Sequence, residues 1–304
     1  MAPAETATRR LNMAQCFNPC GSISGMFVAM NFIQAKLNPM SSDERALLGD
    51  ADFETLKNAD LSVLISPYLI IGLVIVAMLL LMRFTKMPKI GDANHDIHFL
   101  VTIRRIFSLK YYREGVIAQF FYVGAQIMCW TFIIQYGTRV FMAEGMDEQS
   151  AEVLSQQFNI YAMLFFICSR FIATFLMKYV KPAMLLAVFG ILAMVFTAGV
   201  IFFQSRMGVY CLVCVSGCMS LMFPTIYGIA LDGLGDDAKF GAAGLIMAIL
   251  GGSVLPPLQA MIIDEGTLFG SFPATNVSFI LPFICFIIVT LYGFRIHYAR
   301  EKAK

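Results

Sequence analysis

The sequence predicts an all-α integral membrane protein. Of its 304 residues, 59% are apolar and only 14% are charged, and its mean hydropathy is +0.74. A soluble globular chain is about 45–50% apolar and about 25% charged. The apolar surface of this chain is therefore too large for one water-soluble core, and lipid is the solvent that suits it.

Eight apolar stretches are long enough to span a bilayer, which takes roughly 20 helical residues. They cover residues 11–35, 61–82, 114–138, 155–177, 182–204, 207–231, 240–263 and 273–296. Several contain proline, at Pro19, Pro67, Pro224, Pro256, Pro257 and Pro282. Membrane helices tolerate proline, so we expect kinks rather than breaks at these positions. All eight cysteines also lie in these stretches, where we interpret them as packing residues.

Lysine and arginine are distributed unequally between the two sides of the predicted membrane. With the N-terminus inside, 16 of the 22 lie in cytoplasmic segments and 5 lie outside, while Arg170 lies within a helix. Cytoplasmic loops carry such an excess, so both termini are predicted to be cytoplasmic, at a plasma (inner) membrane. The net charge of only +2 gives no indication of a nucleic-acid partner.

The longest predicted cytoplasmic segment divides the chain unequally. Residues 83–113 separate two helices in residues 1–82 from six helices in residues 114–304. Transporters of the major facilitator type have two six-helix halves joined by a long cytoplasmic loop. The pattern therefore predicts helices 5–12 of such a fold, with residues 1–82 as the remnant of the N-terminal bundle. A complete eight-helix protein with one long loop is the alternative.

Motifs for enzymes and cofactors are missing from the sequence. It contains no G-x-x-x-x-G-K-[ST], no G-x-S-x-G and no H-E-x-x-H. The three histidines, His95, His98 and His297, lie in predicted cytoplasmic segments. Cys211, Cys214 and Cys218 share a helical face, but no histidine or carboxylate in that helix completes a metal site. We expect no enzyme activity, catalytic residue, cofactor or metal.

The third predicted helix carries a polar and aromatic stripe. Gln119, Tyr122, Gln126 and Trp130 follow one another at spacings of 3, 4 and 4, which places them on one face. Amides donate to and accept from sugar hydroxyls, and an aromatic ring offers a flat apolar surface to a sugar's C–H face. The stripe therefore favours contact with a monosaccharide. Bonding between helices by the same amides is the alternative.

Two other helices carry shorter polar rows. They are Asn12, Gln15, Asn18 and Ser22 on the first, and Ser216, Ser220, Phe223 and Tyr227 on the sixth. Polar side chains are costly in lipid and tend to face a bundle interior or a watery cavity. The sixth-helix row suits either ligand contact or packing between helices.

Charged residues are nearly absent from the predicted helices. Arg170 is the exception, and snorkelling to the interface or a structural ion pair is favoured over substrate contact. Glu114 and Asp232 lie only at helix ends. Proton-coupled transport normally needs a carboxylate in the pathway, and we expect none in these eight helices.

Three stretches resemble the fucose permease family, the sugar–proton symporters of the major facilitator superfamily. They are residues 9–19 (RRLNMAQCFNP), residues 118–126 (AQFFYVGAQ) followed by Trp130, and residues 223–227 (FPTIY). The resemblance covers essentially the whole chain. It implies twelve helices around a central sugar cavity that opens alternately to each side. By the same resemblance the cavity is contacted by fifth-helix, seventh-helix and tenth-helix residues, namely Gln15, Asn18, Gln126, Trp130 and Phe223.

The resemblance also implies which parts of the complete transporter this chain lacks and which partners it has. The family carries its coupling carboxylates in the first and fourth helices, and Met1 falls just after the fourth, so a fragment or a mis-assigned start is expected. The expected partners are a monosaccharide (L-fucose, or galactose or glucose), a proton as coupling ion in the complete protein, and the lipid bilayer. A glucose/galactose transporter of the same family and a non-transporting membrane remnant are the alternatives.

Overall fold

A computed structural model of the chain describes residues 4–15, 48–85, 99–268 and 272–302, with isolated positions between residues 21 and 40. The described chain is almost entirely helical. Its elements are α1 (Ala4–Gln15), α4 (Asp50–Phe84), α5 (Phe99–Ser108), α6 (Lys110–Ala143), α7 (Glu148–Leu176), α8 (Pro182–Phe202), α9 (Arg206–Met219), α10 (Met222–Leu231), η3 (Gly235–Asp237), α11 (Ala238–Met247), η4 (Ala248–Leu250), α12 (Gly251–Asp264), β1 (Thr267–Leu268), β2 (Phe272–Pro273), α13 (Ala274–Ser278) and α14 (Ile280–Lys302).

Seven helical segments of the described chain are long and apolar enough to cross a membrane. They are Ala51–Phe84, Lys110–Ala143, Glu148–Leu176, Pro182–Phe202, Arg206–Leu231, Ala238–Asp264 and Ala274–Lys302. Seven of the eight predicted spans thus have a counterpart, and the all-α membrane class is confirmed. The remaining predicted span, residues 11–35, lies mostly outside the described residues, and only its start falls in α1.

Packing groups the chain into two units. Residues 1–19 and 96–304 form the first unit, and residues 20–95 form the second. The second contains α4, whose apolar side chains from Leu69 to Phe84 are largely exposed, as suits a helix surrounded by lipid. The predicted division at residues 82 and 113 stays a prediction.

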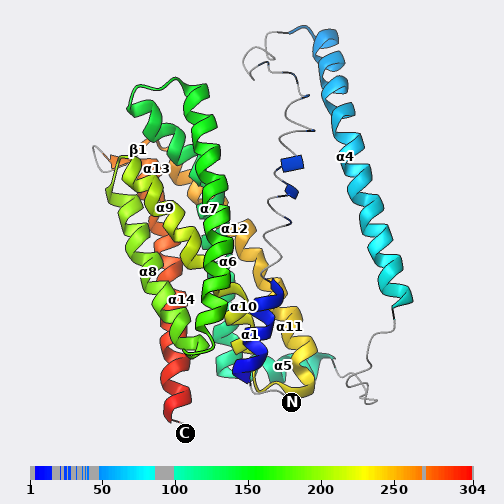
Figure 1. Ribbon diagram of the computed structural model, residues 1–304, viewed down its shortest axis with the longest axis vertical. Helices are drawn as coiled ribbons and strands as arrows, with labels where there is room; N and C mark the ends of the chain where they lie inside the picture. The colour runs from blue at the N-terminus through cyan, green and yellow to red at the C-terminus, as the bar shows by residue number, and fades with distance from the viewer. Residues whose placement is uncertain are drawn as a thin grey trace. The chain divides into compact units, whose positions relative to one another are not determined.

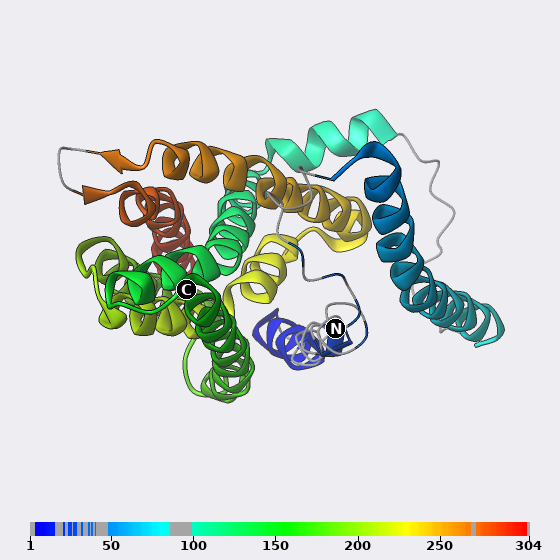
Figure 2. The same cartoon turned by 90° about the horizontal axis from the view of Figure 1, so that it is seen from above.

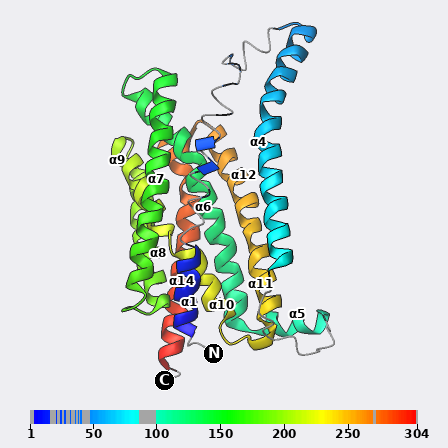
Figure 3. The same ribbon diagram turned by 45° about the vertical axis from the view of Figure 1, so that its right-hand side comes forward.

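Helix α6 is the central element of the first unit. It packs against α7, α9, α10, α12 and α14, while α14 also packs along α8. Figures 1 and 3 show α6 running between α7 and α12. Its inner face buries large side chains, among them Tyr122, Met128 and Tyr136, which are at most 1% exposed. Any ligand-contacting residue on α6 is therefore held by a packed helix.

The two ends of this unit are fixed in different ways. At the end where α14 finishes, Arg295 pairs with Glu114 at 3.2 Å and Arg300 pairs with Asp232 at 2.6 Å. The start of α1 lies at this same end (Figures 1 and 3). At the opposite end a hairpin of two short strands, β1 and β2, with two residues each, precedes α13. The strands are the orange arrows of Figure 2. This end is called the hairpin end below.

Two features differ from the predicted elements. The predicted loop 83–113 contains α5, whose Ile106 is buried and whose Arg105 pairs with Asp237. The sixth predicted helix is broken into α9 and α10 at Ser220 and Leu221, whereas only a kink was predicted. Pro224 explains the break, because it has no N–H to donate to the carbonyl of Ser220, four residues earlier.

Candidate functional site

Near the break between α9 and α10, side chains from α6 and α7 bond to backbone carbonyls, and Pro224 leaves the carbonyl of Ser220 without its usual helical donor. The Tyr122 hydroxyl donates to the carbonyl oxygen of Met219 at 2.9 Å. The Ser169 hydroxyl donates to that of Gly217 at 2.8 Å, and Nε of Arg170 donates to that of Ser220 at 2.5 Å. Unpaired carbonyls are costly in an apolar interior, so these contacts stabilise the broken helix.

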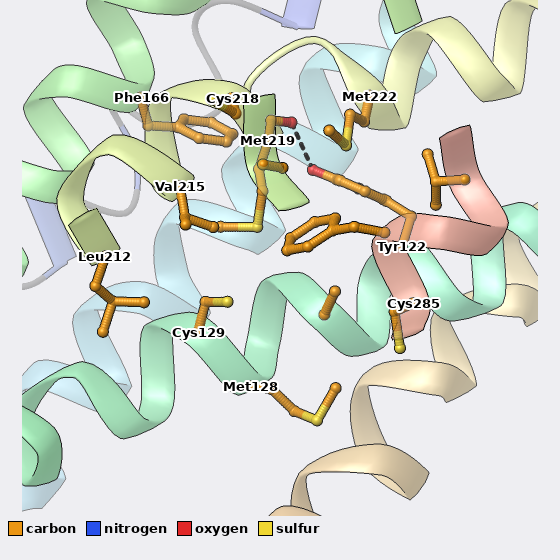
Figure 4. Packing of buried hydrophobic residues seen from close by; sticks show 14 of the residues in the cluster. Tyr122, Met128, Cys129, Phe166, Leu212, Val215, Cys218, Met219, Met222 and Cys285 are labelled. Carbon is orange, nitrogen blue, oxygen red and sulfur yellow. Dashed lines mark hydrogen bonds between the residues drawn. The ribbon is translucent and has the colours of Figure 1, made fainter. Parts of the chain in front are cut away.

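Tyr122 belongs to the packed core of this region. Its side chain is fully buried, as is Met219, and Figure 4 shows the hydroxyl reaching the Met219 backbone beside Met222. Tyr122 is therefore a predicted sugar contact whose polar group already has a protein partner in the described structure.

Arg170 connects three elements. Besides Ser220 of the helix break, it donates through Nη1 to the carbonyl of Gln15, at the C-terminal end of α1, at 2.9 Å. Its guanidinium lies 4.6 Å from the centre of the Phe166 ring. The residue is 3% exposed, so of the two structural alternatives predicted for it, snorkelling to the interface is the one that the structure contradicts. Carbonyls at helix C-terminal ends carry partial negative charge, which explains how a buried cation is accommodated.

The α6 stripe and the sixth-helix row come together beside the break. Trp130 Nε1 donates to the Ser216 hydroxyl at 3.3 Å. The Trp130 ring also packs edge-on against Phe166, with centroids 5.0 Å apart. Phe223 lies 6.4 Å from the Tyr122 ring and stacks on Tyr227 at 6.3 Å. The result is a cluster of aromatic rings in which Trp130, Phe223 and Tyr227 stay partly exposed.

The predicted amides differ in their surroundings. Gln119 is fully buried, and neither atom of its amide has a hydrogen-bond partner among the described residues. Gln126 is half-buried about two turns further along. Gln15 is also half-buried, and its carbonyl accepts from Arg170. Asn18 lies outside the described residues.

Sequence reasoning missed other buried polar residues. Gln259 donates to the Ser278 hydroxyl at 3.1 Å, and Asn276 donates to the carbonyl of Val200 at 2.9 Å and to the Tyr136 hydroxyl at 3.3 Å. Both are single amides with no row of polar neighbours at helical spacing, so the pattern used for α6 could not find them. Their contacts join helices near the hairpin end.

Comparison with known proteins identifies the family to which the chain belongs. No protein-family model matches it. Over 97% of its length it is 50% identical to an "L-fucose-proton symporter" of Haemophilus influenzae, and the alignment covers 68% of that protein. The chain belongs to the fucose permease family. This member is also 26% identical, over 95% of its length, to a "Glucose/galactose transporter" of Brucella abortus, of which 63% is covered.

A solved structure supports the same placement. The fold of this fucose permease family member matches the crystal structure of a major facilitator superfamily transporter in the outward conformation, with a TM-score of 0.80 and 25% identity. The match covers 97% of this chain and 69% of the solved chain. The chain thus spans about two thirds of the length of the relatives it matches, and it is a multi-pass membrane protein of the major facilitator superfamily.

Proposed function

We propose that this chain contributes the sugar-contacting C-terminal bundle of a proton-coupled monosaccharide carrier, and that its sugar is L-fucose. The observation that carries the proposal is the 50% identity with an L-fucose–proton symporter over 97% of the chain. The more distant match to a glucose/galactose transporter supports the sugar class and makes those hexoses the second choice. A carrier of this kind changes no covalent bond in its substrate, so the chain is not an enzyme.

The chemistry beside the helix break supports this substrate class. Gln15 and Gln126 are half-buried amides, and Trp130, Phe223 and Tyr227 are partly exposed rings. Together they offer hydrogen-bonding groups for hydroxyls and flat surfaces for C–H faces. Asn18 remains a predicted contact.

The two fully buried stripe residues have separate roles in this proposal. Tyr122 positions the cluster through its bond to Met219. Gln119 carries an amide without a partner in the described part of the chain, and a sugar hydroxyl is the partner that we propose for it.

The proposal is tested by sugar binding to the purified chain in lipid nanodiscs. Trp130 is the only tryptophan, so its fluorescence reports on the cluster directly. We expect L-fucose to change this fluorescence at lower concentration than D-galactose or D-glucose. The reverse preference would favour the glucose/galactose alternative, and no response to any of the three would favour a non-transporting remnant.

A matched pair of variants tests the stripe itself. Gln126→Ala should weaken L-fucose binding by about 1–3 kcal/mol, because a buried sugar hydroxyl loses its partner. Ile127→Ala, on a different face of α6, should change the affinity little. Equal losses in the two variants would mean that the stripe serves packing.

The described helices offer no carboxylate deep in an apolar span that could couple sugar binding to a proton. The carboxylates of the described helices lie outside the predicted apolar spans or at their ends; Glu114 and Asp232, for example, form ion pairs with Arg295 and Arg300. We infer that these helices bind sugar without moving a proton. Liposomes containing this chain should show no sugar-dependent alkalinisation of the medium, and such a signal would contradict the inference.

We further propose that the protein lies in a plasma (inner) membrane with both termini in the cytoplasm. The distribution of 16 cationic residues on one predicted side and 5 on the other supports this orientation. The start of α1 and the end of α14 lie at one end of their unit, which agrees with termini on the same side (Figures 1 and 3).

A further inference from the structure

A pocket lined by both polar and apolar side chains lies at the hairpin end of the bundle, beyond the cluster at the helix break. It has a volume of about 750 Å³ and is lined by α6, the first turns of α7, the end of α12 and α13. Pockets of roughly 300–1,000 Å³ suit small-molecule ligands. The pocket is large enough for a monosaccharide with its water.

The pocket continues the face of α6 that carries the stripe. Ile134 and Thr138 line it, and they follow Trp130 at successive intervals of four residues. Four residues correspond to about 6 Å along a helix, so Thr138 lies about 12 Å beyond Trp130. The pocket therefore begins about one turn of α6 beyond Trp130 and extends to about two turns beyond it.

Charges of both signs surround the pocket. Arg139 contributes a guanidinium, and Glu148 and Glu152 contribute exposed carboxylates, with the Gln135 amide beside them. The Nη1 atom of Arg139 is buried and has no hydrogen-bond partner in the part of the chain that the structure describes. Glu152 accepts a long bond of 3.4 Å from Gln156.

This mixture of charges selects the chemical class of ligand. The two carboxylates outnumber the guanidinium, so an anion would be repelled on balance, and a simple cation offers no acceptor to the unpaired Nη1 of Arg139. A neutral polyhydroxylated molecule fits both, because each hydroxyl can accept from the guanidinium and donate to a carboxylate. Ile134 and Ile263 supply apolar surface for its C–H groups.

We propose that this pocket is a second monosaccharide-binding site, which holds the sugar at the hairpin end before it reaches the α6 stripe. The site deepens the proposed function and rests on it, since the same sugar occupies both places. With the predicted orientation, the pocket faces the outside of the cell. Sugar bound in the pocket raises the local sugar concentration next to the face of α6 that runs from the pocket to the stripe.

The experiment measures the two sites by separate signals on the chain in nanodiscs. Saturation-transfer NMR with millimolar L-fucose detects all bound sugar, including weakly bound sugar, whereas Trp130 fluorescence reports on the cluster. Gln126→Ala removes a cluster contact, and Arg139→Gln removes the guanidinium of the pocket. Gln135→Ala is a second pocket variant at an exposed side chain that does not endanger folding. Arg206→Gln is the control, because Arg206 is a cation paired with Glu144 and does not line the pocket.

We expect Gln126→Ala to lose most of the fluorescence response and to keep at least half of the saturation transfer. That remainder should fall several-fold when Arg139→Gln or Gln135→Ala is added, and it should persist when Arg206→Gln is added. A remainder that is absent, or that both pocket variants leave unchanged, overturns the pocket while the wild-type fluorescence response still supports the proposed function. Absence of both signals in the wild type overturns both proposals.

Discussion

Removing the Tyr122 hydroxyl separates a positioning role from a ligand contact. Tyr122→Phe keeps the ring and its packing, so no cavity forms, but the carbonyl of Met219 loses the donor that lies 2.9 Å away. Both residues are fully buried, and water cannot replace the lost bond. An orphaned buried acceptor costs about 1–3 kcal/mol. We therefore expect the variant to unfold more easily by this amount, with L-fucose affinity changed much less.

The measurement is thermal unfolding in detergent micelles, followed by circular dichroism, alongside the Trp130 titration. Tyr210→Phe is the control, because Tyr210 lies on the neighbouring helix α9 and is 50% exposed, so its hydroxyl can be hydrated. A Tyr122→Phe variant that melts like the wild type but loses most of its L-fucose affinity would refute the reasoning. Tyr122 would then donate to the sugar rather than to Met219.

Three further predictions concern packing, the buried cation and orientation. Gly251→Ala should destabilise the bundle by roughly 1–3 kcal/mol, because the new Cβ would overlap the Phe120 carbonyl oxygen and lie 2.8 Å from its carbon. The control is Gly72→Ala, in open space on α4, which should be neutral or slightly stabilising when thermal unfolding is followed in the same way. Arg170→Met should lower the melting temperature far more than Arg206→Met. The first variant removes two hydrogen bonds from a charged donor to backbone carbonyls, each bond worth about 1.5–3 kcal/mol. The second removes only the solvent-accessible ion pair with Glu144, worth about 1 kcal/mol or less. A cysteine introduced between residues 41 and 60 should react with an impermeant reagent added outside intact cells, and labelling only from the cytoplasmic side would reverse the predicted orientation.

The sequence alone was sufficient for the class of protein and for most of its spans. Apolar stretches of about 20 residues can only be helices in lipid, since every backbone group must be bonded within the segment. The same reasoning missed α5, because a ten-residue helix within a polar connection has no such stretch. It also missed the break at Ser220. Pro224 was visible in the sequence, but whether a proline kinks or breaks a helix depends on donors from neighbouring helices, here Tyr122 and Arg170.

The sequence predicted which side chains share one face of α6. It did not predict which of them bond to the protein and which are left to contact a ligand. Spacing placed Gln119, Tyr122, Gln126 and Trp130 on one face of α6, and it could not tell which polar groups would find partners in the protein. The packing of α6 against α9 decides this, because it brings the Tyr122 hydroxyl to within 2.9 Å of the Met219 carbonyl at the end of α9.

The helix break gives the polar residues of this bundle a common explanation. Pro224 removes the helical donor to the Ser220 carbonyl in a dry interior, and Arg170, Tyr122 and Ser169 donate to backbone carbonyls around that place. These three side chains are occupied by the protein itself. The amide of Gln119 has no partner among the described residues, and Gln126, Trp130, Phe223 and Tyr227 keep part of their surface open. A sugar that binds beside the break would therefore be recognised by the second group of residues and only oriented by the first. Substitutions in the second group should change affinity, whereas those in the first should change stability.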